Sequence, residues 1–484
     1  MDACDGRSAI GIVRWRAAVL VACGAALAML VCGCADGKRE GSAPASRLSS
    51  GPGADRVRVG ARGANLIIVV LDAARADHFG AYGYQRDTTP NADALFADSI
   101  VFEEAYCLAP NTKASVASLF TAQFPDTHGV VGMFVALSPE VPTLAEVLKE
   151  NGFRTVCFSA NPFLSLEFGF ERGFDEFHEI FRQVNLKANE LGQVPAELLG
   201  QAATSWFQEH GEERFFAYLH FLEPHNPYAP PEPFADRYRG DTRHETLIAA
   251  YDGNLAYVDT VVGEVLSALE RLGLVENSVI VLMSDHGEAF GEHGRFYHAD
   301  TVYQETARVP LAVRLPSACG AKPESRSEII PIVDLMPTML DLLGVAFPAS
   351  MQGRNRLGLL AGEEEAEPFY AVSRSRGRDG TGGVERPEEV VYALTTPQYT
   401  LMLGNKGKRV ELYDRESDPG QRRNIASERQ EVTATLRGQF EDWAKMQRAR
   451  PVVLRGGEVL VSEERRAEPS DRTKEHLKAL GYLK

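Results

Sequence analysis

The stretch VIVLMSDHGEAFGEHGRFYH, from Val279 to His298, gives the clearest sign of the fold. Its first five residues, Val279–Met283, have the length and β-branched content of a fully buried strand. The run stops at Ser284, and Asp285 and His286 follow on the predicted turn. In an open α/β sheet, ligands bind at the carboxyl ends of strands. A carboxylate and an imidazole placed there can bind a divalent cation, although Asp285 can also cap a turn and His286 can be a structural polar residue.

Apolar runs of the same kind lie on the N-terminal side of this strand and predict four more buried strands: Asn65–Ala73, Ile100–Tyr106, Arg154–Ala160 and Arg214–Leu222. Helical stretches separate them, and apolar residues repeat at helical spacing from Leu255 to Leu269. Strands alternating with helices predict an α/β fold, with a large, mostly parallel sheet covered by helices on both faces. A last helix, Val333–Gly344, closes this unit.

The pattern changes after Gly362. The segment EEVVYALTTPQYTLMLGNKGKRVELYD contains two or three strand-like runs with a GNKGK turn, and RQEVTATLRGQFEDWAKM has the spacing of an amphipathic helix. Residues 363–484 are therefore predicted to form a smaller C-terminal α+β subdomain with an antiparallel sheet, followed by a tail.

Residues 1–34 have the order of an export signal, because three arginines precede the apolar stretch Ala17–Gly33. The stretch ends in Val31, Cys32, Gly33 and Cys34, which resembles the box at which bacterial lipoproteins are cleaved and lipidated. An exported protein, anchored in the membrane by a lipid on Cys34 and facing the periplasm or the cell surface, is the expectation. An uncleaved anchor is the alternative, although 17 apolar residues are at the short limit for a span. Residues 35–62 are rich in Gly, Ser, Ala and Pro and predict a flexible linker.

The composition limits the classes of partner and of cross-link. The chain has 484 residues and a formal net charge of −16, and no basic stripe with interleaved aromatic residues is present. These features argue against a nucleic-acid partner. An anionic substrate would need a local positive site, such as a metal. If Cys34 is lipidated, Cys107, Cys157 and Cys319 remain in the body of the protein, so at most one disulfide can form and none is required.

Two further polar residues lie where chemistry is expected. Asp72 ends the first predicted strand, at the same edge of the sheet as Asp285. Thr112, in APNTKASVASLFTAQFPDTHG, precedes a segment with helix-like spacing, which places its hydroxyl near a helix N-terminus that favours anions. Each residue taken alone is also explained as a turn or helix cap.

Several motifs, in this order along the chain, resemble the sulfatase branch of the alkaline phosphatase superfamily. They are LDAARADHFGAYGY, TPNADALFADSIVFEEAY, APNTKASVASLFTAQFPDTHG, FLEPHNPYAPP, the segment from Tyr251 through SDHGE, RVPLAVRLP and VDLMPTMLDLLG. The resemblance implies a catalytic domain over residues 63–362 that hydrolyses esters with one bound metal ion.

Carried onto this chain, the resemblance implies that the metal ligands are Asp72, Thr112, Asp285 and His286. It also implies that His225, in EPHNPY, contacts the substrate oxyanion or protonates the leaving group, although a structural His beside prolines is the alternative. His298 would lie near the leaving group, and Lys113 is a further candidate to contact the anion.

Two departures from the family pattern matter. Sulfatases usually carry a Cys or Ser, converted to formylglycine, in C/S-x-P-S-R, whereas this chain has Thr112, Lys113, Ala114, Ser115 and Val116. Formylglycine cannot form from Thr112, and Val116 replaces the motif arginine. Ala73 also stands where many sulfatases have the second of two aspartates. The phosphonate monoester hydrolases of the superfamily have a single Asp there, so the resemblance still implies metal binding.

The chemistry expected from these residues is nucleophilic. A bound cation would lower the pKa of the Thr112 hydroxyl and neutralise the ester oxygens, so that Thr112 attacks sulfur or phosphorus and forms a covalent intermediate. Mixed Asp and His ligands permit calcium, manganese or zinc. Because a sulfated Thr lacks the elimination route of a formylglycine sulfate, phosphodiesters or phosphonates are expected to be better substrates than sulfates. The alternatives are a phosphoethanolamine-type transferase and a catalytically inactive binding protein of the same fold.

Overall fold

The computed structural model describes residues 51–184, 194–348, 350–363, 371–375, 390–404, 407–449, 452–453, 459–460 and 465–483. The predicted signal segment, Cys34 and residues 35–50 of the predicted linker lie outside the described residues. Within the part of the chain that is described, no helix combines the length and the apolar character needed to cross a membrane. Cys107, Cys157 and Cys319 are buried free thiols.

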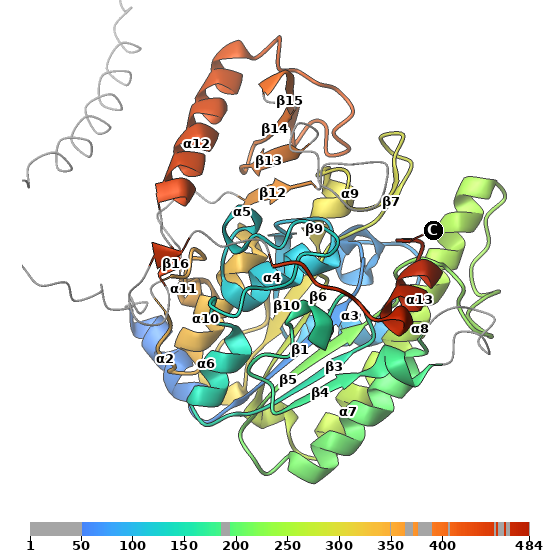
Figure 1. Cartoon of the computed structure of the whole chain (residues 1–484), viewed down its shortest axis with the longest axis vertical. Helices are drawn as coiled ribbons and strands as arrows, with labels where there is room; N and C mark the ends of the chain where they lie inside the picture. The colour runs from blue at the N-terminus through green and yellow to red at the C-terminus, as the bar shows by residue number, and fades with distance from the viewer. Residues whose placement is uncertain are drawn as a thin grey trace, which may run out of the picture. The chain divides into compact units, whose positions relative to one another are not determined.

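A large mixed sheet forms the centre of the structure (Figure 1). Along the sheet the strands follow the order β11-β2-β10-β6-β1-β5-β3-β4, and the short β9 also pairs with β2. In chain order they are β1 (Asn65–Leu71), β2 (Ile100–Tyr106), β3 (Arg154–Ser159), β4 (Glu176–Glu179), β5 (Phe215–Phe221), β6 (Ser278–Met283), β9 (Arg308–Val309), β10 (Leu311–Arg314) and β11 (Glu324–Pro331). The five strands from β6 to β4 run parallel, whereas β10 is antiparallel to both its neighbours. The predicted α/β class is confirmed.

Helices pack on both faces of this sheet. The side chains of β1 show this, because they alternate between two hydrophobic cores. Leu66, Ile68 and Val70 belong to one hydrophobic core, whereas Ile67, Val69 and Leu71 belong to a second. Side chains of a strand alternate between faces, so the two cores lie on opposite sides of the sheet. The first core contains residues of α2 (Pro52–Gly60), α4 (Thr112–Thr121), α6 (Leu144–Glu150) and α10 (Leu335–Leu342), and the second contains residues of α3 (Pro90–Ala97), α7 (Ala196–His210) and α8 (Arg243–Arg271).

The end of the predicted linker is ordered. Residues 52–60 form α2, with Pro52 in the first turn, where proline is well tolerated. Ala54 and Val57 are buried in the first core, and Arg58 forms an ion pair with Asp341 of α10 at 2.9 Å. The assignment of this part of 35–62 to a flexible linker is therefore wrong. The Gly- and Pro-rich composition of the segment indicated a linker, although Ala54 and Val57 have helical spacing.

The C-terminal region contains the predicted antiparallel sheet. The strands β12 (Ala371–Arg374), β13 (Val391–Thr395), β14 (Tyr399–Gly404) and β15 (Arg409–Asp414) pair in this order, and α12 (Gln430–Ala449) follows. This region is joined closely to the large sheet, since Ser373 donates a hydrogen bond to the Cys107 carbonyl and Arg415 pairs with Glu104. The chain then returns toward the large sheet with α13 (Asp471–Ala479).

Candidate active site

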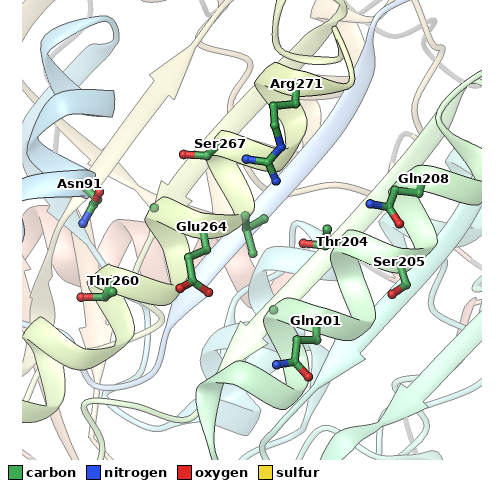
Figure 2. A pocket seen from close by; sticks show the side chains of 12 residues that line it. Asn91, Gln201, Thr204, Ser205, Gln208, Thr260, Glu264, Ser267 and Arg271 are labelled. Carbon is green, nitrogen blue, oxygen red and sulfur yellow. The ribbon is translucent and has the colours of Figure 1, made fainter.

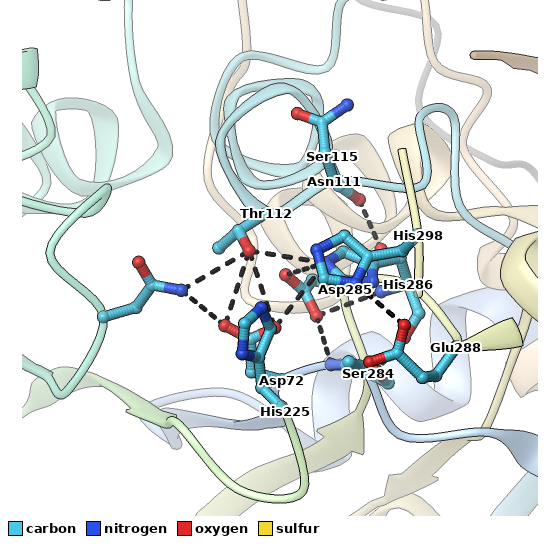
Figure 3. Close-up of polar contacts among 12 residues, drawn as sticks. Asp72, Asn111, Thr112, Ser115, His225, Ser284, Asp285, His286, Glu288 and His298 are labelled. Carbon is cyan, nitrogen blue, oxygen red and sulfur yellow. Dashed lines mark hydrogen bonds and ion pairs between the residues drawn. The ribbon is translucent and has the colours of Figure 1, made fainter. Parts of the chain in front are cut away.

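Polar side chains from neighbouring parallel strands meet at one edge of the large sheet (Figure 3). Asp72 follows β1, Asp285 follows β6, His220 lies near the end of β5 and Asn161 follows β3. Because these strands run in the same direction, their carboxyl ends bring the four side chains together. Oxygen and nitrogen atoms that can bind a metal therefore gather at the strand ends, where the sequence predicted that Asp72 and Asp285 would meet.

Thr112 is the first residue of α4 and lies in the middle of this cluster (Figure 3). Its Oγ1 is 3.3 Å from Nε2 of His286, 3.4 Å from Oδ2 of Asp72 and 3.4 Å from Nδ2 of Asn161. The helix cap is Asn111, whose side chain accepts a hydrogen bond from the Ala114 amide. Thr112 is therefore not the N-cap residue, and its hydroxyl is available for chemistry.

Asp285 is held by backbone amides on one oxygen. Its Oδ1 accepts hydrogen bonds from the amides of Ala73 and His286, at 3.2 and 3.0 Å. Its Oδ2 is buried and has no hydrogen-bond partner among the described residues, and lies 3.5 Å from Nε2 of His286. An unpartnered carboxylate oxygen in a buried position is costly. This oxygen is placed to bind a cation.

His286 presents a lone pair to the same point. Its Nδ1 is 2.9 Å from the Gly287 carbonyl, which can only accept, so Nδ1 carries a proton and, in the neutral ring, Nε2 holds the lone pair. Burial lowers the pKa of His286, but the charges of Asp285 and Asp72 outweigh it and raise the pKa, so a cation that binds Nε2 replaces a proton there. Nε2 lies 3.5 Å from an oxygen of Asp72 and of Asp285. Ser284 fixes the loop, because its hydroxyl donates to the His286 carbonyl and accepts from the Ala74 amide. A histidine whose second nitrogen is fixed in this way is the arrangement typical of metal ligands.

The donor set fits a divalent cation. One ligand atom each from Asp72, His220 and Asp285 lie within 4.8 Å of one another, and all three residues are buried. Burial and the charge of Asp72 raise the pKa of Asp285. Burial also favours the neutral form of Asp72, but hydrogen bonding to His220 and the charges of nearby histidines outweigh it and lower the Asp72 pKa. Two close buried carboxylates of this kind are stabilised by a shared cation.

A second group of residues lies beside the cluster. Nδ1 of His298 is 3.0 Å from Oε1 of Glu288, and the His298 ring centroid is 4.4 Å from that of His286. The His225 ring centroid lies 4.9 Å from that of His298. Burial lowers the pKa of His225 to about 4 and raises that of Glu288 to about 7. The structure thus brings His225 and His298 together next to His286, as Figure 3 shows.

Lys113 points to another part of the site. Its ammonium donates a hydrogen bond to the Met133 carbonyl and lies 4.4 Å from the ring centroid of Phe168 and 5.6 Å from that of Phe163. Cation-π contacts of this type are favourable in buried surroundings. Lys113 therefore borders the site on the side of these aromatic rings.

Sequence reasoning missed three residues of the site: Asn161, His220 and Tyr482. His220 carries a detectable signal, because it is a polar residue inside the apolar strand β5. Asn161 directly follows the predicted strand Arg154–Ala160 and shares the strand-end position of Asp72. No local sequence pattern marks Tyr482 as a site residue, because it contacts His298, which is 184 positions away in the sequence.

An open hollow of about 650 Å³ lies between α7 and α8 (Figure 2). Its lining includes Gln201, Thr204, Thr260, Glu264 and Arg271. It contains none of the strand-end residues described above, so it is separate from the candidate active site.

Comparisons with known proteins agree with this geometry. The sequence model of the family described as Sulfatase matches residues 64–345, and that of the N-sulphoglucosamine sulphohydrolase C-terminal region matches residues 291–446. An arylsulfatase of Clostridium perfringens is 23% identical over 447 residues, covering 75% of this chain and 90% of the relative.

Two solved structures show the same fold. A phosphonate monoester hydrolase of Agrobacterium radiobacter has a TM-score of 0.66 at 20% identity and covers 80% of this chain and 95% of its own. A second protein, solved in complex with its substrate D-glucosamine-2-N,6-O-disulfate, has a TM-score of 0.66 at 19% identity. The match covers 80% of this chain and 98% of the other chain. With a family match over more than half of its length, this chain belongs to the sulfatase family of the alkaline phosphatase superfamily.

Proposed function

We propose that this protein is a metal-dependent hydrolase of anionic esters in which Thr112 is the nucleophile in place of formylglycine. The observation that carries the proposal is the position of the Thr112 hydroxyl, within 3.3 to 3.5 Å of His286 and Asp72. The hydroxyl is buried and lies beside the carboxylate of Asp72, the imidazole of His286 and the amide of Asn161. Named relatives in the family include sulfatases and phosphonate monoester hydrolases, which are ester hydrolases.

Asp72, Asp285, His286 and His220 are the residues that would hold the cation. The unpartnered Oδ2 of Asp285 and the lone pair on Nε2 of His286 support this assignment. A divalent ion supplies positive charge that favours the ionised Thr112 hydroxyl and neutralises the oxygens of the ester. Oxygen and nitrogen ligands suit calcium, manganese and zinc alike, and they do not select among the three.

The residues of the chain then act in order. Thr112 attacks the central atom of the ester, and the alcohol or phenol leaves from the opposite side. His298 lies beside His286 and is placed to donate a proton to the leaving oxygen, and His225 lies next to His298, where it can contact the ester oxygens. Water then attacks the same central atom, which releases the acid and restores the Thr112 hydroxyl.

The substrate is proposed to be a singly charged phosphorus ester. Thr has no second oxygen through which a sulfate could be eliminated, so a sulfated Thr112 must wait for attack by water at sulfur. Attack by water at phosphorus is the easier route, because the site stabilises a pentacoordinate transition state. A phosphate monoester brings close to two negative charges to a site with one proposed cation and Val116 in place of the motif arginine. Phosphodiesters and phosphonate monoesters carry one charge and fit better.

A turnover panel tests the proposal. Purified protein is assayed with an aryl sulfate, a phosphate monoester, a phosphate diester and a phosphonate monoester in the presence of calcium, manganese or zinc. We expect diester or phosphonate turnover to be fastest and Thr112→Ala to abolish it. Thr121→Ala is the matched control, because Thr121 ends the same helix and, within the described part of the chain, its hydroxyl bonds only to its own turn, at the Ala117 carbonyl.

Two outcomes would reject the assignment. Faster hydrolysis of the aryl sulfate than of the matching diester would contradict the substrate preference. Full activity of Thr112→Ala would contradict the nucleophile. Metal binding without turnover of any ester would favour the alternative of a binding protein that keeps the sulfatase fold.

A further inference from the structure

The hydroxyl of Tyr482 lies between the two histidines of the candidate active site. It is 2.7 Å from Nε2 of His225 and 2.8 Å from Nε2 of His298. Nδ1 of His225 faces the carbonyl of Asn226 at 2.5 Å, so it carries a proton and Nε2 is left to accept. The Tyr482 hydroxyl therefore donates to His225, and its oxygen accepts from His298. One oxygen atom occupies the point at which both imidazoles converge.

Tyr482 belongs to the C-terminal tail, which we define as residues 465–483. The tail first pairs with the loop at Phe134–Ala136, through hydrogen bonds of 2.7 Å at the Arg465 carbonyl and the Ala467 amide. It then forms α13, which is capped by Ser470 and attached to Arg182 through Thr473. Figure 1 shows α13 in red, next to the mark of the C-terminus.

The tail is a built part of the fold. Leu477 and Leu480 of the tail are buried and belong to the two cores of the protein. The Tyr482 ring packs at 4.7 Å between centroids against Phe163, which closely follows the site residue Asn161. These contacts hold the hydroxyl of Tyr482 in a defined place above the histidines.

The site below the tail is closed. Thr112 is 1% exposed, Asp72 is 0% exposed and His225 is 1% exposed. An ester cannot reach the Thr112 hydroxyl unless a covering segment moves. The strands and α4 are fixed in the cores along their length, whereas the buried core residues that the tail contributes are Leu477 and Leu480. The Tyr482 hydroxyl makes one hydrogen bond to each histidine. An anionic substrate oxygen in its place can only accept, so its binding draws a proton onto Nε2 of His225 and forms charge-assisted hydrogen bonds, which are stronger than those of a neutral hydroxyl.

We propose that the C-terminal tail is a lid over the active site, and that Tyr482 occupies the place of a substrate oxygen between His225 and His298 until the substrate displaces it. This inference rests on the proposed function for the identity of the ligand as an anionic ester. It predicts that the tail and the substrate compete for the same two imidazoles. Access of any reagent to these histidines then depends on Tyr482.

The first test measures access without turnover. Metal-free wild type and Tyr482→Ala are treated with diethyl pyrocarbonate, and modification of His225 and His298 is followed by peptide mass spectrometry. We expect both histidines to react about tenfold faster or more in the variant, because Leu477 and Leu480 still hold the tail in place while the side chain that covers the imidazoles is removed. Tyr399→Ala is the matched control, since Tyr399 lies in β14 of the C-terminal sheet. Equal rates in the wild type and Tyr482→Ala overturn the lid.

The second test measures competition. Tyr482→Phe keeps the ring against Phe163 and removes only the hydroxyl. With the best ester of the panel, we expect kcat/KM to rise by about three- to tenfold, because the substrate no longer displaces a hydrogen-bonded hydroxyl. An unchanged or lower kcat/KM overturns the competition and makes Tyr482 a residue that assists the bound substrate.

The two proposals can fail separately. If Tyr482→Ala exposes the histidines but no ester is hydrolysed, the lid holds and the proposed function fails. If esters are hydrolysed through Thr112 but the histidines react equally in both proteins, the function holds and the lid fails.

Discussion

Asn161 donates a hydrogen bond of 2.5 Å from its Nδ2 to Oδ2 of Asp72, although 89 positions separate the two residues. The same nitrogen lies 3.4 Å from Oγ1 of Thr112. The side-chain oxygen Oδ1 of Asn161 is fixed in turn, because it accepts a hydrogen bond from the Phe163 amide. Asn161 therefore orients the carboxylate that would bind the metal and the hydroxyl that would attack the ester.

Replacement of Asn161 should weaken metal binding. We expect Asn161→Ala to lower the affinity for manganese and the rate of ester turnover by about 10- to 100-fold, the usual effect of losing a hydrogen bond that orients a ligand. Titration calorimetry measures the affinity. Asn151→Ala is the matched control, because Asn151 caps α6 on the surface and bonds only locally, to Val147. A manganese affinity equal to that of the wild type would contradict the role of Asn161.

Removal of the charge on Asp285 should raise the thermal stability of the metal-free protein and reduce the stabilisation that a metal gives. Burial and the charge of Asp72 raise the pKa of Asp285, so its ionised form is unfavourable in the metal-free protein. In EDTA, we expect Asp285→Asn to have a higher Tm than the wild type, by about 2–4 °C for each kcal/mol of unfolding free energy gained. Manganese should raise the Tm of the wild type but hardly change that of the variant. Differential scanning fluorimetry measures both shifts.

The control for this experiment is Asp442→Asn, which removes an exposed carboxylate on α12 that pairs with Lys445. Its Tm should respond to EDTA and to manganese as the wild type does. An Asp285→Asn variant that gains as much Tm from manganese as the wild type would show that Asp285 is not a ligand.

His128 should make the protein sensitive to acid. Burial lowers the pKa of His128 to about 3, and its ring contacts Ser118 and the Val130 amide. The unfolded chain binds this proton below about pH 6.5, whereas the folded protein does not. The unfolded state thus holds more protons, so stability is lost as the pH falls from about 6.5 toward 3.

Denaturant unfolding between pH 7 and pH 4 measures this loss. We expect His128→Gln to be less stable than the wild type at pH 7 but to lose less stability on acidification, by roughly a few kcal/mol, since each pKa unit is worth about 1.4 kcal/mol. His244→Gln, an exposed position at the start of α8, should leave the pH profile unchanged. The same slope in His128→Gln as in the wild type would contradict the assignment.

The strands and the two aspartates were predictable for one reason. A short, β-branched apolar run such as Val279–Met283 is typical of a strand in a sheet covered on both faces, and a carboxylate that follows such a run then lies at the carboxyl end of the strand. The predicted bounds of β2, Ile100–Tyr106, agree with the structure at both ends. The local sequence pattern was enough to predict the position of a residue that directly follows a strand.

The rest of the site depends on long-range packing. His220 reads as one polar residue in an apolar strand, and only the pairing of β5 with β1 puts it beside Asp72. Tyr482 reaches the site because the tail is held by Arg182 and by Phe163, which are distant in sequence, and no local pattern reveals these contacts. The helix α2 was missed because its buried face consists of only Ala54 and Val57.

The location of the protein is a prediction about residues outside the described part of the chain. We expect the mature protein to begin at Cys34 with a diacylglycerol on its thiol. Mass spectrometry of the N-terminal peptide from the membrane fraction tests this. Cys34→Ala should keep the upstream residues, whereas Cys32→Ala, two positions earlier, should be processed normally. An unmodified N-terminus upstream of Cys34 in the wild type would reject the lipoprotein assignment.

A covalent adduct on Thr112 is the last expectation. During turnover of an aryl phosphonate, the Thr112 oxygen forms a bond to phosphorus as the bond to the phenol oxygen breaks, and the phenol leaves with a proton. Water then cleaves the Thr112 ester, so quenching with acid before this second step should trap the phosphonyl group on the peptide that contains Thr112. Mass spectrometry should find the adduct in the wild type and in Thr121→Ala, and none in Thr112→Ala. A burst of phenol equal to the enzyme concentration with the adduct on another residue would assign the nucleophile elsewhere.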